Sequence, residues 1–293
     1  MKLRSIFQFK LQIALMFAMA VWGLSWTNAK ILGIYTSPLL SMVWRFFLAT
    51  ICFVPVMKWT GHSFKIPQSA FKFVFMNGCL MTVYNYFYFR GTQLGLAGSG
   101  GVIVTTLNPI ITSLLAVIIF KDLLKSKDIL GALLGLTGGA FIIKIWSVNY
   151  VDLVQNGNIH FILASVSWAF VTLITTSSKD KIHFIPYSFW SIAIAGVLSF
   201  FMSIGEPIFS VFNHGWDFWL NLFILSAGAL VFGTTVYFLA AVRLGSRKAS
   251  SYVFTVPVTA MGFSMIILGE HLDWSTAIGS LFAVSGVYLI NKS

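Results

Sequence analysis

One positive charge stands alone inside an apolar stretch of this sequence. Arg45 lies near the middle of the segment 38–57, which contains no other charged residue. A charge at the centre of a bilayer costs from about 2.5 to more than 10 kcal/mol, so this guanidinium must face protein or reach the surface. Two interpretations remain open. Arg45 pairs with backbone carbonyls or helix ends inside a bundle, or it is the counter-charge for a carboxylate or phosphate on a substrate.

A second set of polar side chains recurs with helical spacing. Asn77, Tyr84 and Tyr88 lie on one face of a helix predicted over residues 70–89, and Asn85 lies beside them. A face that contacts lipid would not contain asparagine. This face is therefore expected to point into the interior of a helix bundle.

Tryptophans occur at matching depth in two further segments. Trp22 and Trp26 are one helical turn apart in the first segment, and Trp168 precedes Thr172 by one turn in the sixth. Tryptophan at this depth is common in packed cores. Next to hydroxyl groups it is also what an aromatic-walled binding site requires.

Two more tyrosines, Tyr237 and Tyr252, complete the candidate substrate-binding residues. Tyr88 and Tyr237 lie near the ends of their segments, where tyrosine often anchors a helix at the membrane surface. For these two, interfacial anchoring and substrate contact remain equally open.

Acidic residues and histidines are confined to loops and segment ends. This leaves the middle of the membrane without a carboxylate or histidine to carry protons. The sequence has no metal-ligand spacing, no paired carboxylates within a segment and no phosphate-binding glycine loop. We expect no enzyme activity, no metal and no cofactor.

Composition places the whole chain in lipid. Hydrophobic residues make up 58% of its 293 residues and charged residues only 9%, far from the roughly one quarter charged in soluble domains. At about 20 residues per crossing, the chain can hold about ten membrane helices with short loops. We predict them at roughly these positions: 11–30, 38–57, 70–89, 97–120, 128–146, 158–178, 187–205, 218–241, 249–269 and 274–291. The first resembles a signal peptide but is expected to be retained.

The positive charges gather at one set of helix ends. Most of the 19 lysines and arginines flank the ends that also carry both termini, and only Lys30, Arg90 and Lys144 flank the opposite ends. Lysine and arginine stay on the cytoplasmic side of short loops, so both termini are predicted to be cytoplasmic. The net charge of +11 follows this membrane pattern, so we expect no binding to nucleic acid.

The chain contains a duplication. Tyr88-Phe89 recurs as Tyr237-Phe238 and Leu94-Gly95 as Leu244-Gly245; further matches are Pro109 with Pro257, Asp122 with Glu270, Gly131 with Gly279, and Gly138 with Gly286. A proline inside a helix removes a hydrogen bond and clashes with the carbonyl four residues earlier. Because both copies keep this kink, we interpret Pro109 and Pro257 as hinges, with a simple packing kink as the alternative.

An odd number of helices per copy inverts the second copy in the membrane. We predict an all-α integral membrane protein of ten transmembrane helices in two inverted five-helix repeats, residues 1–146 and 158–293, joined by an external linker at 147–157. Inverted repeats are the recurrent architecture of carriers that open a central site to either side in turn.

These prolines, acidic residues and glycines resemble the EamA-type branch of the drug/metabolite transporter superfamily over nearly the whole chain. The resemblance implies a bacterial inner-membrane secondary transporter that works by alternating access. It implies a small polar or amphipathic substrate, most commonly an amino acid, and export as the usual direction. Smaller relatives dimerise through a helix that this duplicated chain already has twice, so we expect a monomer.

Two rival functions remain at this point. The first is a membrane receptor or scaffold that transports nothing. Such a protein has no reason to keep paired prolines and a polar interior face. The second is a carrier that imports an organic cation or a nucleotide-like metabolite.

Overall fold

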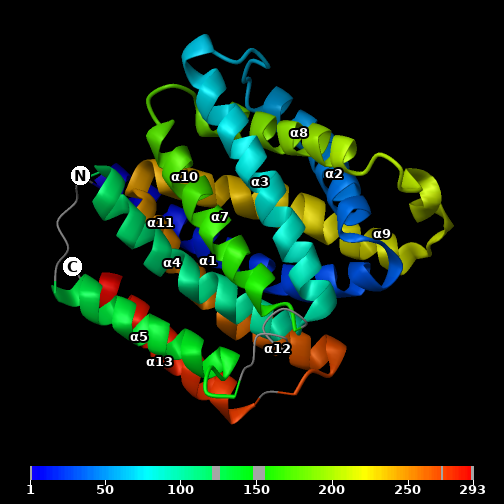
Figure 1. The fold of residues 1–293 in the computed structure, drawn as a ribbon. Helices are drawn as coiled ribbons and strands as arrows, with labels where there is room; N and C mark the ends of the chain where they lie inside the picture. The colour runs from blue at the N-terminus through cyan, green and yellow to red at the C-terminus, as the bar shows by residue number, and fades with distance from the viewer. Residues whose placement is uncertain (1, 121–125, 148–155, 272, 292–293) are drawn as a thin grey trace.

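Long apolar stretches form helices here because a helix satisfies its own backbone hydrogen bonds without water. The computed structural model describes residues 2–120, 126–147, 156–271 and 273–291, and every regular element among them is helical (Figure 1). The first half of the chain forms α1 (Lys2–Tyr35), α2 (Pro38–Trp59), α3 (Gln68–Leu94), α4 (Ala97–Phe120) and α5 (Ser126–Ile143).

The second half is more interrupted than the first. It contains α7 (Asn158–Ser177), α8 (Phe184–Met202), the 3-10 helix η1 (Ile208–Asn213), α9 (Trp216–Phe223), the π-helical segment η2 (Ile224–Thr234), α10 (Thr235–Leu244), α11 (Ser246–Tyr252), the 3-10 turn η3 (Val253–Thr255), α12 (Val256–Leu268) and α13 (Trp274–Asn291). Each of the predicted hydrophobic segments coincides with one of these helices or with a run of them. Asp122, which the duplication matches with Glu270, lies outside the described residues, and so do residues 148–155 of the predicted linker.

Among the described helices, six are long and apolar enough to cross a membrane. These six candidate spans are Phe9–Tyr35, Pro38–Trp59, Ala97–Ile119, Asn158–Ser177, Phe184–Met202 and Trp216–Leu244. Two shorter apolar helices cover Ile129–Phe141 and Val256–Leu268. The 27 residues of α3 are not among the six spans, and its sequence contains the polar stripe and charges at Lys72 and Arg90.

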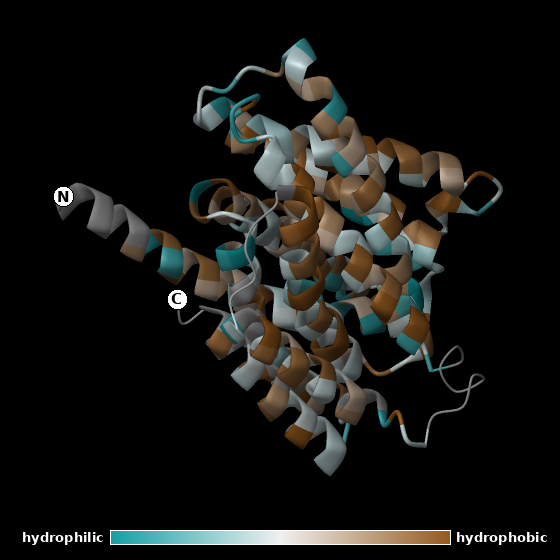
Figure 2. Ribbon diagram, turned by 60° about the vertical axis from the view of Figure 1, so that its left-hand side comes forward, coloured by the Kyte–Doolittle hydropathy of each residue, from teal (hydrophilic) through white to brown (hydrophobic). Residues whose placement is uncertain are grey.

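Apolar side chains cover the outside of the bundle, as a protein surrounded by lipid requires. Large hydrophobic residues such as Phe17, Ile118, Phe201 and Ile266 are exposed, and brown apolar patches run along the outward helix faces in Figure 2. Exposed tryptophans mark helix ends at Trp59, Trp146, Trp216 and Trp274. Tryptophan favours the level of the lipid headgroups, so these four side chains fit the edges of a membrane layer.

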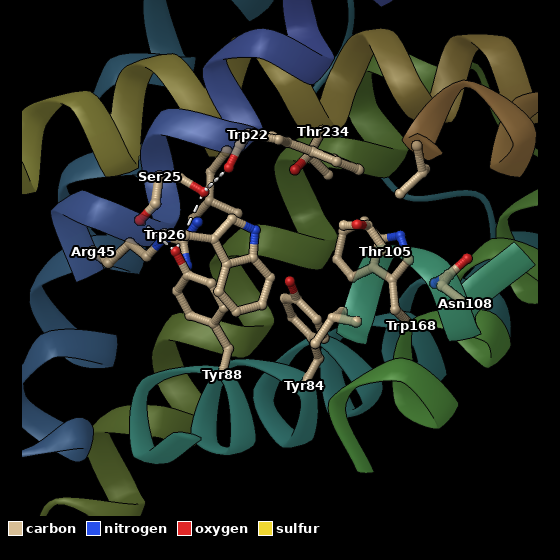
Figure 3. Close-up of a pocket in the computed structure, with 13 residues that line it drawn as sticks. Trp22, Ser25, Trp26, Arg45, Tyr84, Tyr88, Thr105, Asn108, Trp168 and Thr234 are labelled. Atoms are coloured by element: carbon tan, nitrogen blue, oxygen red, sulfur yellow. Dashed lines mark hydrogen bonds between the residues drawn. The ribbon is translucent and has the colours of Figure 1, made fainter. Parts of the chain in front are cut away.

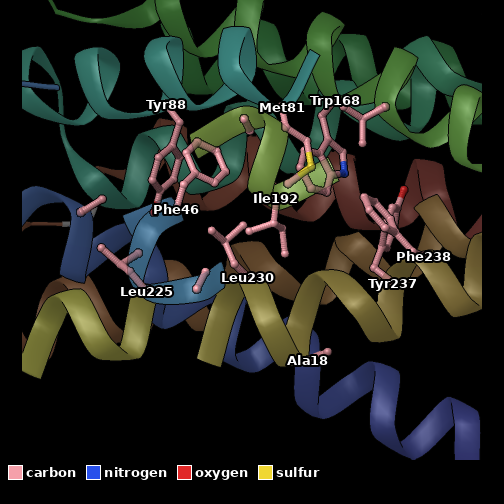
Figure 4. Close-up of a cluster of buried hydrophobic side chains, with 14 of the residues drawn as sticks. Ala18, Phe46, Met81, Tyr88, Trp168, Ile192, Leu225, Leu230, Tyr237 and Phe238 are labelled. Atoms are coloured by element: carbon pink, nitrogen blue, oxygen red, sulfur yellow. The ribbon is translucent and has the colours of Figure 1, made fainter. Parts of the chain in front are cut away.

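The interior is filled by side chains from both halves of the chain. Figure 4 shows Tyr88 and Met81 of α3 facing Trp168, Ile192 and Leu230 of the second half. Helices α3 and α4 both pack against α7, and α1 packs against η2 and α12. The core is therefore shared between the halves.

Helices α5 and α13 lie side by side at the edge of the bundle (Figure 1). Their contact is close because Gly286 lies directly against the backbone of Gly131 and Gly135, which leaves no room for a Cβ atom. Small residues that allow helices to approach in this way are typical of membrane bundles. Gly131 and Gly286, which lie in corresponding stretches of the duplication, thus meet each other within one chain.

Candidate functional site

A small cavity lies at the centre of the bundle, and both halves of the chain line it (Figure 3). The first half contributes α1 through α4, and the second half contributes α7, η2 and η3. The lining side chains are Trp22, Ser25, Trp26, Arg45, Tyr84, Tyr88, Val104, Thr105, Asn108, Trp168, Leu230, Thr234 and Val253. Its volume for water-sized spheres is about 30 Å³, enough for about two water molecules. The cavity is therefore small in this structure.

Aromatic rings form most of the cavity wall. The Trp168 ring lies edge-on to Trp22, with centroids 5.2 Å apart, and tilted against Tyr84 at 4.6 Å. Trp26 and Tyr88 make a second edge-on pair at 4.6 Å. These distances are typical of favourable aromatic pairs. The tryptophans that the sequence places at matching depth on α1 and α7 do meet in space.

Arg45 reaches this wall from α2. Ser37 begins that helix by accepting a hydrogen bond from the backbone N–H of Leu40 at 3.2 Å, and Pro38 at the first turn suits a helix start. The Arg45 side chain is only 4% exposed, and its Nη1 donates to Asn85 Oδ1 at 2.7 Å. Its guanidinium carbon lies 5.2 Å from the ring centre of Tyr88. The charge faces inward, against rings and an amide.

Tyr88 and Trp22 are each held in place by a backbone carbonyl. The Tyr88 hydroxyl donates to the Ser25 carbonyl at 2.6 Å, and Trp22 Nε1 donates to the Ala229 carbonyl in η2 at 3.0 Å. A Cβ atom at Gly233 would lie 2.6 Å from Trp22 Nε1, so this glycine lets the indole approach η2. The bond from Trp22 fastens the first half to the π-helical segment.

Tyr237 and Thr172 lie one layer behind the cavity. Their hydroxyl oxygens are 2.7 Å apart, and the Tyr237 ring packs against Trp22 at 5.1 Å and against Trp168 at 5.9 Å. Both Tyr88 and Tyr237 are almost completely buried. Neither side chain is exposed at the bundle surface, where an interfacial anchor would lie.

Five other predicted residues are not among the cavity-lining residues, and one of them, Asn85, is the hydrogen-bond partner of Arg45. Asn77 is buried, and its Nδ2 makes a long contact of 3.7 Å with Met81 Sδ, while Tyr252 is half-buried at the end of α11. Pro109 directly follows the lining residue Asn108 inside the continuous helix α4. Pro257 lies in the first turn of α12, directly after the 3-10 turn η3.

Four cavity residues carry no signal that sequence reasoning could use. Val104, Leu230 and Val253 are apolar residues within apolar segments, and Thr234 was not distinguished from other hydroxyl residues. Ser25 lies between Trp22 and Trp26, and Thr105 and Asn108 lie just before Pro109, so proximity to these residues is the sequence signal that could have found them. The π turn that presents Leu230 and Thr234 has no recognisable sequence pattern.

The two ends of the bundle differ. We call the end that carries Glu206, Asp217, Glu270 and Asp273 the acidic end. There Glu270 Oε1 and Oε2 accept hydrogen bonds from the backbone N–H groups of Ala97 and Gly98, at 2.8 and 2.9 Å. A carboxylate is stabilised at a helix N-terminus, so Glu270 caps α4 from the other half of the chain.

Other contacts close the acidic end further. Tyr35 donates to Asp217, Ser37 donates to Glu206, and Lys144 forms an ion pair with Asp273 at 2.6 Å. Each contact joins the first half to the second. Lys30 Nζ also donates to the Gly95 carbonyl at 2.7 Å, which fixes the turn between α3 and α4 to α1.

At the opposite end, which we call the terminal end, a hollow opens between α7 and the turn from α10 to α11. Thr176, Ser177, Lys179, Leu244, Gly245, Ser246 and Arg247 line it. Its volume is about 400 Å³, in the range of small-molecule sites. In the duplication, Leu244-Gly245 corresponds to Leu94-Gly95, which Lys30 holds at the acidic end. The Leu94-Gly95 turn is thus held by a hydrogen bond from Lys30, whereas its counterpart, the Leu244-Gly245 turn, borders the hollow.

Sequence comparison identifies the class of molecule that has this architecture. The profile of the EamA-like transporter family matches residues 10–144 and again residues 155–292. The chain belongs to this family. As an EamA-family protein it is a multi-span membrane protein, and the two matches cover nearly all of both halves.

Its relatives are similar over most of their length. An uncharacterized transporter of Synechocystis sp. is 27% identical, with 93% of this chain and 87% of the relative aligned. The uncharacterized transporter YoaV of Bacillus subtilis is 24% identical, with 96% of each chain aligned. One crystal structure matches with a TM-score of 0.73 and 16% identity over 95% of this chain and 97% of the other, which shows a shared fold.

Proposed function

We propose that this EamA-family protein is a secondary transporter that moves a small amphipathic metabolite across the bacterial inner membrane by alternating access. The observation that supports this most is the central cavity. It is lined by helices from both halves and combines aromatic rings with one buried charge. Amino acids and related solutes, and export as the direction, follow from the resemblance to the family.

We propose that all ten hydrophobic segments cross the membrane as two inverted units, residues 1–146 and 158–293, joined by the linker 147–157. The helix contacts support this. When each helix is replaced by its counterpart in the other half, one observed contact between helices becomes another observed contact. The contact of α4 with α7 corresponds to that of α12 with α1, and the contact of α3 with α7 corresponds to that of η2 with α1. Helix α5 contacts its own counterpart α13, and α2 contacts its counterpart α8.

The difference between the two ends supports alternating access. Several hydrogen bonds between the halves narrow the acidic end, where the pocket beside Glu270 has a volume of about 70 Å³, whereas the hollow at the terminal end has about 400 Å³. Positive charges gather at the terminal end, which we assign to the cytoplasm. Under this proposal the structure corresponds to a state closed toward the outside. We propose that Pro109 and Pro257 are hinges for the exchange with the opposite state, and that the monomer transports alone.

Cysteine labelling in membrane vesicles tests the proposal without knowledge of the substrate. The native cysteines, Cys52 and Cys79, are first replaced by alanine. Ser25→Cys and Thr234→Cys then place single thiols in the cavity wall. A small water-soluble thiol reagent is expected to reach both from either side of the membrane, because the site opens to each side in turn.

Thr82→Cys is the matched control. Thr82 is buried on α3, donates to the Gly78 carbonyl at 2.9 Å and does not line the cavity. It is expected to stay unreactive. Labelling of the cavity thiols from one side only would favour a receptor, and labelling from neither side would leave no aqueous pathway. Either result overturns the transporter proposal.

A further inference from the structure

The few buried polar atoms of the cavity lining that have no hydrogen-bond partner in the described part of the chain are all donors. A guanidinium has five N–H donors. Among the described residues, Arg45 hydrogen-bonds only to Asn85 Oδ1, and its Nε has no partner. Asn108 Nδ2 is also buried without a partner. Each unsatisfied buried donor is unfavourable, so a solute that presents acceptor oxygens would be stabilised here.

Trp168 has a third buried donor, on the side of Tyr237 behind the cavity. Its indole Nε1 lies near Tyr237 but makes no hydrogen bond of normal geometry. By contrast, the hydroxyls of Ser25 and Thr105 donate to carbonyls of their own helices. In Figure 3 Arg45 lies at one end of the cavity, and Trp168, Thr105 and Asn108 lie toward the other. The donors thus flank an aromatic middle.

The charge of the lining has one sign. Arg45 is its single ionised side chain, and no aspartate or glutamate is among the thirteen lining residues. A carboxylate can accept two parallel N–H bonds from one guanidinium, and this pairing is stronger than a neutral hydrogen bond. A second positive charge in the same small space would be repelled by Arg45, with no lining carboxylate to offset the repulsion.

The remaining wall suits a flat apolar body. Trp22, Trp26, Tyr84, Tyr88 and Trp168 supply rings that pair with one another at distances of 4.6–5.8 Å. An aromatic solute would pack against these rings and so replace some of the contacts that the rings make with one another. Because the cavity now has room for about two waters, the rings must separate to admit it. Tyr84, which is the least buried of these tyrosines, is in a position to move.

We propose that the solute is a monoanionic aromatic carboxylate without an ammonium group. Arg45 binds its carboxylate and the tryptophan and tyrosine rings hold its aromatic body. This inference rests on the proposed transport function. Of the amino acids and related solutes named above, it selects the related carboxylic acids that have no amine.

Three matched probes test the charge preference on the wild-type protein in detergent. 3-Phenylpropanoate has the carboxylate alone, phenylalanine has the carboxylate and an ammonium, and 2-phenylethylamine has the ammonium alone. Binding is measured near pH 7 by quenching of tryptophan fluorescence and by calorimetry. We expect 3-phenylpropanoate to bind about tenfold or more tighter than phenylalanine, because Arg45 repels the ammonium of phenylalanine and no lining carboxylate offsets this repulsion. We expect no binding of 2-phenylethylamine.

Equal binding of phenylalanine, preferred binding of the amine, or no binding of any probe at millimolar concentration would each overturn the inference. Preference for the amine would indicate that the rings form a cation site instead. The wild-type comparison decides this even if variants of the buried arginine fail to fold.

Two variants place the carboxylate on Arg45. Arg45→Gln is expected to weaken 3-phenylpropanoate binding by about tenfold or more, and Arg45→Lys by less because the charge remains. Thr82→Val, outside the cavity lining, should bind normally, and melting curves identify folded variants. Unchanged affinity in folded Arg45→Gln contradicts the assignment.

The two proposals can fail separately. If the cavity cysteines react from both sides but the carboxylate shows no preference, the transporter proposal stands and the substrate class is wrong. If the carboxylate binds as expected but the cysteines react from one side only, the anion site stands and transport is wrong. Counterflow of radiolabelled 3-phenylpropanoate in proteoliposomes then measures both together.

Discussion

Corresponding helices in the two halves of this protein are built differently. In the first half, α3 continues unbroken from Gln68 to Leu94 and α4 from Ala97 to Phe120. In the second half, the stretch that corresponds to α3 contains the π-helical segment η2, and the stretch that corresponds to α4 contains the 3-10 turn η3. Both breaks border the central cavity. The second half contributes Leu230 and Thr234 from η2 and Val253 from η3.

This difference suggests a division of labour within the site. The first half holds the charge and most of the rings on continuous helices, and Arg45 is fixed by Asn85 of the same half. Apart from Trp168 on α7, the second half presents its wall from segments whose backbone hydrogen bonds depart from the α pattern. Such π and 3-10 segments often mark functional sites and hinges. The comparison predicts that the first half is a rigid side that recognises the solute and that the second half is a moving side.

The largest expected effect concerns the rigid side. Asn85→Leu removes the acceptor of Arg45 and leaves a buried charge with one partner fewer, at a cost of about 3 kcal/mol in the free energy of unfolding. A clearly lower melting temperature in detergent is expected. Asn77→Leu is the matched control, because Asn77 lies on the same helix and its Oδ1 has no partner. Similar losses in both variants would show that Asn85 has no special role.

A smaller effect is expected where the second half closes onto the first. Glu270→Gln removes the charge that caps α4 and keeps only one acceptor oxygen, which should weaken the closed acidic end by about 1–2 kcal/mol. Ser264 is buried beside Gly98 at this end. A single cysteine at Ser264, in the background without Cys52 and Cys79, should react several-fold faster in the Glu270→Gln variant.

Asp273→Asn provides the control for this measurement. It breaks the ion pair with Lys144, whose two side chains are 62% and 42% exposed, and exposed pairs contribute little. Its thiol reactivity should stay close to that of the parent. Equal acceleration by both substitutions would mean that any loss of charge at this end loosens it.

The prolines test the moving side directly. Pro257→Ala restores a backbone N–H next to η3 and allows α11 and α12 to form one continuous helix. We expect several-fold slower counterflow with little change in binding. Pro109→Ala, in a helix that already continues past the proline, should slow transport less. Pro55→Ala on α2, where the proline is exposed, should have no effect. A larger effect at Pro109 would reverse the proposed division.

The smallest effect concerns a neutral pair in the second half. Thr172→Val removes the hydroxyl that meets Tyr237 and is expected to cost about 1 kcal/mol of stability. Thr176→Val, one turn further along α7, loses only a bond to the backbone of its own helix and should cost less. Thermal unfolding followed by tryptophan fluorescence compares the two. The Asn85→Leu loss should exceed both.

Sequence reasoning identified the helices and the chemically distinctive part of the site. Apolar length predicts helices in lipid; Arg45 is conspicuous because a charge is rare at that depth, and Trp22 and Trp168 because they lie at matching depth next to hydroxyl groups. Asn77 shares the stripe of Tyr84 and Tyr88, yet it lies outside the cavity lining, because a face that points inward along its whole length borders the cavity only in part. Leu230 and Val253 look like any core residue. Their exposure to the cavity depends on local hydrogen-bond register, which residue types do not encode.

The π-helical segment η2 also contains one more residue in each hydrogen-bonded loop than an α-helix does. If one such turn changed to the α pattern, α10 would rotate by about 100° and slide by about 1.5 Å relative to α9. Tyr237 would then leave Thr172 and Trp168, and the Ala229 carbonyl, which accepts from Trp22 and from the Thr234 hydroxyl of η2, would change its partners. A slip of a single residue could thus exchange one wall of the cavity for another while the ends of the chain stay in place.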